Sequence, residues 1–103
     1  MSKNSDFRSY VLKKLEDPSF AEEYLKVALE EYLEDGDKIA FYQALKDVVD
    51  ARGGATEIAK ESDLSRQNLY KVFSGKTNPG IEKLGKILQN LGLTLTIKPK
   101  VSY

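Results

Sequence analysis

The chain has 103 residues, 41% of them hydrophobic and 31% charged, with three Pro and seven Gly, which is typical of one small globular domain and excludes a disordered or fibrous chain. It contains no Cys and no His, so disulfides, thiolate or imidazole zinc sites, cysteine catalysis and His-based triads are excluded. No apolar run approaches the roughly 20 residues of a membrane span, and the N-terminus lacks the apolar core of a signal peptide; we therefore expect a soluble, cytoplasmic protein with no membrane partner.

The formal net charge is zero, but the two halves of the chain differ. Residues 1–50 hold 7 Lys and Arg against 12 Asp and Glu, whereas residues 51–103 hold 9 against 4. The first half is therefore −5 and the second +5. A basic half can face phosphate, and an acidic half suits a cationic protein. Solvated helix faces are the alternative explanation of both.

Three helices are expected in residues 1–54, which we treat as acidic N-terminal helices packing on the core. The first covers residues 6–15. Asp17 and Pro18 mark a clearer start, because Asp caps free amides and Pro suits the first helical position; this helix runs to about Glu34. Asp37 can cap the third, from Lys38 to Arg52, which Gly53 and Gly54 end. The apolar residues on the predicted inner faces are Phe7, Tyr10, Val11 and Leu15, then Phe20, Tyr24, Ala28, Leu29, Tyr32 and Leu33, then Ile39, Phe41, Ala44, Leu45, Val48 and Val49.

The carboxylates between residues 30 and 37 do not form a calcium loop. Such a loop needs oxygen ligands at alternate positions over twelve residues, whereas this stretch is mostly helix around a short turn. Capping and solubility explain these acids, so we expect no metal and no cofactor.

Three further helices are expected in residues 55–92. A short helix spans Thr56 to Glu61, a turn follows at residues 62–64, and Ser65 caps a helix from Arg66 to about Ser74. Gly75 occupies the position where a left-handed residue ends a helix. The last helix runs from Ile81 to Leu91 and carries its apolar residues on one side. Gly85 within it marks either close packing against a neighbouring helix or a tolerated surface glycine.

The final segment, residues 93–103, changes period. Residues 93–98 (LTLTIK) alternate apolar and polar side chains and are rich in strand formers. One strand cannot satisfy its own backbone groups, so this strand is expected to pair across a subunit boundary or with the sheet of a partner. The alternative is an extended tail lying on the helices.

Residues 55–75 have the organisation of a helix-turn-helix. Ala59 is small where the helices cross, Leu64 fills the turn, and Leu69, Val72 and Phe73 anchor the second helix. Arg and Lys can bind guanine edges, Gln and Asn can pair with adenine, and Tyr can contact phosphate or a thymine methyl. The candidate base-contacting residues are Arg66, Gln67, Asn68, Tyr70 and Lys71, and the candidate DNA-backbone contacts are Thr56, Ser65, Ser74, Lys76 and Asn78. A helical hairpin used only for packing needs the same buried residues but not this exposed face.

The sequence resembles the Cro/repressor (Xre) type of helix-turn-helix. The motifs are Ile58-Ala59, Leu64-Ser65-Arg66, Leu69-Tyr70-Lys71, Gly75, Asn78-Pro79 and the end of the last helix, Leu88, Leu91, Gly92 and Leu93. Further segments, LEDP at residues 15–18, AEEYL at 21–25, DVVDARG at 47–53 and LSRQNLYK at 64–71, are similar to the probable addiction-module antidote proteins, the HigA-like antitoxins of type II toxin–antitoxin systems. The resemblance covers about residues 10–98.

This resemblance implies an antitoxin that binds and inhibits a RelE/ParE-like toxin and represses its own operon as a homodimer. Arg66, Gln67, Tyr70 and Lys71 match base-contacting positions of repressor recognition helices, and the matches to backbone-contacting positions are Ser65, Lys76 and Asn78. Two residues depart from the pattern. Ala55 replaces a phosphate-binding Gln, and Asp63 replaces the usual turn Gly, although Asp tolerates a left-handed backbone better than most residues.

We therefore expect an all-α fold: one compact five- to six-helix lambda-repressor-like DNA-binding domain with a helix-turn-helix and a short C-terminal β-strand. The expected function is a DNA-binding transcriptional regulator and antitoxin whose partners are operator DNA, a cognate toxin and a second copy of the chain. The alternative is a protein-interaction module whose helix-turn-helix no longer binds DNA. A small-molecule sensor and an enzyme rank below both, because no ligand pocket and no paired general acid and base can be placed, so we expect no catalytic residues.

Overall fold

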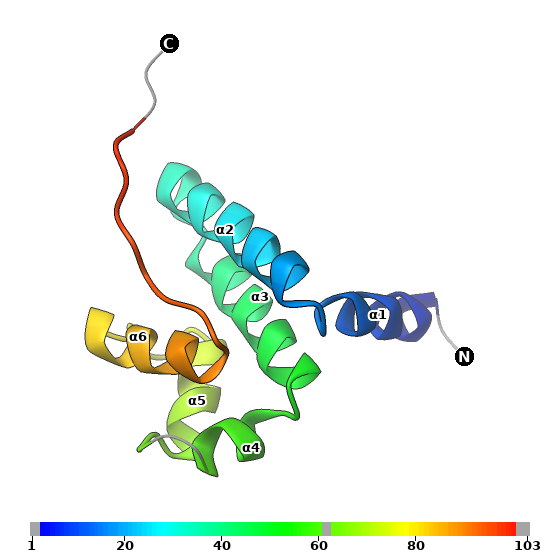
Figure 1. Ribbon diagram of the computed structural model, residues 1–103. Coiled ribbons are helices and arrows are strands. Elements are labelled where there is room, and N and C mark those ends of the chain that lie inside the picture. Colours follow the sequence, from blue (N-terminus) through cyan, green and yellow to red (C-terminus); the bar gives the residue numbers. More distant parts are fainter. Residues whose placement is uncertain (1–2, 61–62, 101–103) are drawn as a thin grey trace.

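The computed structural model describes residues 3–60 and 63–100, with side chains from residue 6 onward. Six helices make up the regular structure of these residues: α1 (Lys3–Lys14), α2 (Pro18–Asp35), α3 (Lys38–Ala51), α4 (Ala55–Lys60), α5 (Arg66–Phe73) and α6 (Ile81–Asn90) (Figure 1). The prediction of an all-α fold with five to six helices is confirmed, and the observed helix ends lie within three residues of the predicted ones. None of these helices is long and apolar enough to cross a membrane.

Three of the helices begin where a polar side chain replaces the missing carbonyl acceptor. The backbone N–H of Ser19 donates to Asp17 Oδ1 at 2.9 Å, and that of Ala40 donates to Asp37 Oδ1 at 3.1 Å. Ser65 Oγ accepts from the backbone N–H of Asn68 at 3.0 Å at the start of α5. All three predicted caps are confirmed, because capping depends on residues within one turn of each other.

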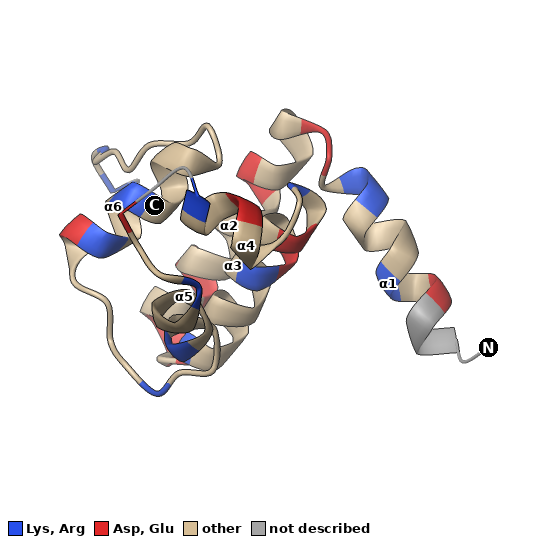
Figure 2. Ribbon diagram, turned by 90° about the horizontal axis from the view of Figure 1, so that it is seen from below, with Lys and Arg blue, Asp and Glu red and all other residues tan. Residues whose placement is uncertain are grey.

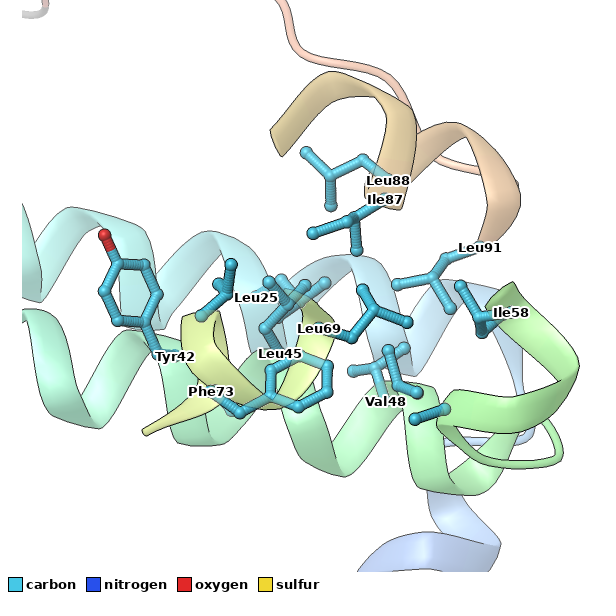
Figure 3. Close-up of a cluster of buried hydrophobic side chains, with 14 of the residues drawn as sticks. Leu25, Tyr42, Leu45, Val48, Ile58, Leu69, Phe73, Ile87, Leu88 and Leu91 are labelled. Atoms are coloured by element: carbon cyan, nitrogen blue, oxygen red, sulfur yellow. The ribbon is translucent and has the colours of Figure 1, made fainter. Parts of the chain in front are cut away.

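The helix α3 lies at the centre of the fold. It packs against α1, α2, α4 and α5 (Figure 1). Its buried side chains are Phe41, Tyr42, Ala44, Leu45, Val48 and Val49. Figure 3 shows this inner face meeting Leu25 of α2, Ile58 of α4, Leu69 and Phe73 of α5, and Ile87 and Leu88 of α6. One cluster of buried apolar side chains therefore supports α5, the helix with the candidate base contacts.

Several predicted core residues are exposed. Phe7 is 68% exposed, Tyr10 60%, Leu33 75% and Ile39 42%, so their assignment to the core was wrong. Phe20, at 39%, is also exposed. These residues fall on the outer parts of α1, α2 and α3, where an amphipathic pattern locates an apolar stripe but no neighbouring helix covers all of it.

The last helix also differs from its prediction. Ile81, its first residue, is 80% exposed; the core contacts of α6 begin at the partly buried Leu84, and its buried residues are Ile87 and Leu88. A Cβ placed on Gly85 would meet nothing within 4 Å. The close-packing explanation of Gly85 is therefore wrong, and the tolerated-glycine explanation remains.

The predicted strand at residues 93–98 does not form; this prediction was wrong. The backbone N–H of Leu93 donates to Leu88 O at 2.8 Å, and Leu93 packs against the core, but the chain then runs away from α6 (Figure 1). Leu95 is 37% exposed and Ile97 is 98% exposed. Alternation of apolar residues favours a strand only where a second strand supplies hydrogen-bond partners, and residues 3–60 and 63–100 contain none.

Candidate nucleic-acid interface

The helices α4 and α5 pack on each other and on α3, which fixes the orientation of α5. Leu69, Val72 and Phe73 are buried on the inner face of α5. Ala55 and Ile58 of α4 are buried beside them. Because these side chains hold one face of α5, the opposite face is presented to solvent in a defined orientation.

All five candidate base-contacting residues are exposed: Arg66, Gln67, Asn68, Tyr70 and Lys71. Two of them touch each other, since the Arg66 guanidinium carbon lies 5.5 Å from the centroid of the Tyr70 ring. Tyr70 is 45% exposed and its ring stands edge-on to the buried Phe73, with centroids 6.4 Å apart. The Arg66 side chain is therefore oriented by a ring that is itself anchored on the core, which reduces the rotamer freedom lost on binding.

The five candidate backbone-contacting residues are also exposed, but their hydroxyls are not equivalent. Ser65 Oγ accepts the capping hydrogen bond and keeps its own proton for an outside acceptor. Ser74 Oγ donates its proton to Lys71 O at 3.1 Å, so in this conformation it has no donor left for a phosphate. Thr56 lies in the first turn of α4, and Lys76 follows the end of α5.

Asn78, the fifth of these residues, accepts a hydrogen bond from a residue that the sequence did not predict as part of this surface. Lys38 Nζ donates to Asn78 Oδ1 at 3.0 Å, although 40 residues separate the two. Lys38 belongs to the acidic half of the chain, but the fold places its ammonium beside the loop between α5 and α6. No local pattern could have found it, because the contact exists only when α3 packs against α5.

The loop before α5 is tied to α6 by an ion pair. Lys86 Nζ lies 2.9 Å from Asp63 Oδ2. The hydrogen bond from Lys86 lowers the pKa of the Asp63 carboxyl and raises that of the Lys86 ammonium. The acidic residue in the predicted turn is thus paired with a cation. The φ angle of Asp63, which would show the expected left-handed backbone, is defined with the carbonyl carbon of residue 62. Residue 62 lies outside the described residues.

The charges around α5 favour an anionic partner. Arg66, Lys71 and Lys76 lie on α5 and the loop after it, Lys38 adds a fourth cation, and Asp63 is the one acid among residues 63–80. Figure 2 shows a basic position on the loop that joins α5 and α6. Exposed cations together with amide side chains on one helix can bind a polyanion and form hydrogen bonds with base edges.

The described residues form a small all-helical fold with an exposed polar and basic face on α5. Comparison with known protein families identifies the family of the chain. The family described as "Probable addiction module antidote protein" matches residues 8–99. The chain is also 31% identical over 78 residues to an uncharacterized protein of Haemophilus influenzae, an alignment that covers 76% of this chain and 79% of the relative. No solved structure matches significantly. The chain belongs to the family of probable addiction module antidote proteins, which confirms that part of the sequence resemblance.

Proposed function

We propose that the protein is the antitoxin of a type II toxin–antitoxin module and that it represses its own operon by binding DNA through α5. The family supports the antidote role, which implies a cognate toxin. The exposed polar face of α5, held by three buried side chains on the opposite face, is the observation that carries the DNA-binding role. In this proposal α4 and α5 form an Xre-type, HigA-like helix-turn-helix within a lambda-repressor-like domain.

The proposed binding mode places the N-terminal part of α5 in the major groove of operator DNA. Arg66 binds a guanine edge, and Gln67 and Asn68 pair with adenines. Ser65 donates its hydroxyl proton to a phosphate, and Lys76 contacts the DNA backbone past the C-terminal end of α5. Lys71 and Tyr70 complete the surface, and a homodimer reads two half-sites about 10 base pairs apart.

The toxin in this proposal is a small basic protein of the RelE/ParE-like kind. The exposed outer face of α2 carries Glu22, Glu23, Glu30, Glu31 and Glu34. Val27 and Leu33 are exposed beside them, at 48% and 75%. An acidic helix face with apolar residues is complementary to a basic toxin surface, and it lies on a different helix from the DNA-binding residues.

A mobility shift with the DNA upstream of the chain's own gene tests the DNA-binding role. We expect the wild-type chain to shift this DNA at low salt and the double variant Arg66→Ala, Gln67→Ala to bind it at least about tenfold more weakly. Lys26→Ala, an exposed lysine of α2, is the matched control and should bind like the wild type. Absence of a shift with the wild-type chain at low salt contradicts the proposal.

A second candidate function is neutralisation of a partner protein without DNA binding. The acidic and apolar outer face of α2 favours it, because this face does not depend on α5. Co-expression with the product of the adjacent reading frame separates the two functions. If the chain binds that product but never shifts its own upstream DNA, the second candidate is correct.

A further inference from the structure

The helix α1 stands apart from the other helices, with its N-terminal end away from the body of the protein (Figures 1 and 2). One side of α1 is attached: Leu15, just past its end, is buried, and Arg8 reaches α3, where its Nη1 lies 2.7 Å from Asp47 Oδ1. The other side carries two large exposed rings, Phe7 at 68% and Tyr10 at 60%. Two exposed aromatic rings on one short helix are unusual for a face that meets only water.

At one end of the exposed side of α1 the Phe7 ring projects into solvent, and at the other end the protein surface is hollow. Phe7, Tyr10 and Lys14 are spaced i, i+3 and i+7, so they form one stripe along the helix. Lys14 Nζ lies 5.6 Å from the Tyr10 ring centroid and 5.9 Å from that of Phe20 in α2. These residues border an open hollow of about 650 Å³, lined by Ser9, Tyr10, Lys13, Lys14, Asp17 and Phe20. Phe7 lies at the opposite end of the stripe from this hollow.

We infer that a second copy of this chain docks on the exposed stripe of α1, with the two α1 helices antiparallel about a two-fold axis. In this arrangement Phe7 of each copy enters the hollow of the other and meets Tyr10, Lys14 and Phe20. Each copy supplies both the projecting Phe7 ring and a hollow, which α1 forms together with Asp17 and Phe20. A two-fold axis therefore places each ring in the hollow of the other copy, as an isologous interface requires. The inference rests on the proposed function in that it names the surface through which the repressor dimer forms.

The charges beside the stripe fit the same partner. Asp6 and Lys13 are seven residues apart and therefore lie on the same flank of α1. Neither forms an ion pair within the described part of its own chain. When two copies of α1 run antiparallel, the same flanks face each other, so Asp6 of one copy lies beside Lys13 of the second copy, and the pair occurs twice. A parallel arrangement would not bring these two residues together.

The dimer is expected to be weak. The exposed parts of Phe7, Tyr10 and Phe20 amount to roughly 300 Å² in each copy, so these rings bury roughly 600 Å² in total, about half of the roughly 1,200 Å² at which standard specific interfaces begin. Two adjacent half-sites on DNA would strengthen such a weak dimer by raising the effective concentration.

Sedimentation equilibrium of the full chain without DNA tests the inference. We expect a monomer–dimer equilibrium in the wild type and a dimer at least about tenfold weaker in Phe7→Ser. Ile81→Ser, which removes an 80% exposed apolar side chain from α6, is the matched control and should dimerise like the wild type. A wild-type chain that stays monomeric at millimolar concentration overturns the inference, and so does a dimer that Phe7→Ser leaves unchanged.

Charge reversal tests the antiparallel arrangement with variants that keep the aromatic rings. Asp6→Lys and Lys13→Glu should each weaken the dimer by roughly threefold to tenfold, and the double variant should restore it, because it rebuilds both pairs with opposite polarity. A double variant as weak as the singles overturns the antiparallel arrangement. Phe7→Ser should still bind a single half-site like the wild type, so loss of the dimer is distinguishable from loss of DNA binding.

Discussion

Lys38 Nζ donates to Asn78 Oδ1 at 3.0 Å, and this hydrogen bond joins the first turn of α3 to the loop that follows α5. The contact places a cation of the acidic half of the chain on the proposed DNA-binding surface. Lys38 thereby adds to Lys76 on the side of α5 where the loop leaves the helix.

Replacing Lys38 should weaken DNA binding for every sequence to the same degree. If Lys38 neutralises one phosphate, Lys38→Ala reduces the slope of log K against log salt by about 0.9. Fluorescence anisotropy over a salt series measures this slope. Lys26→Ala, on α2, controls for the loss of one charge, and a Lys38→Ala slope equal to that of the control would remove Lys38 from the interface.

Gly75 should be less replaceable than Gly36, although both have φ of +76°. A Cβ at Gly75 collides with Cδ1 of Ile39, whereas a Cβ at Gly36 meets nothing within 4 Å. The left-handed backbone costs either alanine variant about 1 kcal/mol of unfolding free energy. We expect Gly75→Ala to lose slightly more unfolding free energy than Gly36→Ala in urea, because the end of the Ile39 side chain must move, and this side chain is exposed enough to move at small cost. Equal losses would show that the Ile39 side chain yields without cost.

Asp47 should contribute more to the attachment of α1 than Asp50 does. Asp47 accepts from Arg8 of α1 at 2.7 Å and from Tyr24 Oη of α2 at 2.9 Å, whereas Asp50 accepts from Arg8 at 2.6 Å and from its helix neighbour Lys46 at 2.8 Å. Asp47→Ala also leaves the part-buried Tyr24 hydroxyl unpaired, at a cost of about 1 kcal/mol or more. Amide hydrogen exchange in α1 should therefore accelerate more in Asp47→Ala than in Asp50→Ala; the reverse order would contradict this assignment.

Tyr24 should make the protein less stable at high pH. Burial, followed by the hydrogen bond to Asp47, raises the pKa of Tyr24 from 10.0 to about 12. A raised pKa means that the folded state holds the phenol proton more tightly, so this stabilisation is complete below pH 10 and is lost as the pH rises towards about 12. Urea unfolding across this range should show a shallower decline for Tyr24→Phe than for the wild type. Tyr70→Phe is the control, and identical declines in Tyr24→Phe and the wild type would refute the prediction.

The parts of the fold that depend on neighbours in sequence were predictable. Asp17, Asp37 and Ser65 cap their helices as expected, because the capping residue and the amide it accepts from lie within one turn. Leu69 and Val72 are buried as their spacing predicts. The candidate residues on the other face of α5 are exposed for the same reason.

The parts that depend on the tertiary arrangement were not predictable. Periodicity marks Phe7 and Leu33 as apolar positions, but it does not show whether another helix covers them. Alternation in residues 93–98 favours a strand, but only a second strand can supply the missing hydrogen bonds. The place of Lys38 beside the candidate DNA-binding residues could not be predicted, because its hydrogen-bond partner, Asn78, is 40 residues away in the sequence.

Selection of binding sites from a random duplex pool tests the central claim most directly, namely that the exposed face of α5 reads DNA sequence. The wild-type chain should enrich a two-fold symmetric site with half-sites about 10 base pairs apart. Arg66→Ala should lose preference at one position in each half-site, at about 1 to 3 kcal/mol, while Lys76→Ala should keep the same site with lower affinity. Enrichment of no sequence by the wild type, or of the same sequence with undiminished preference by Arg66→Ala, would contradict the account.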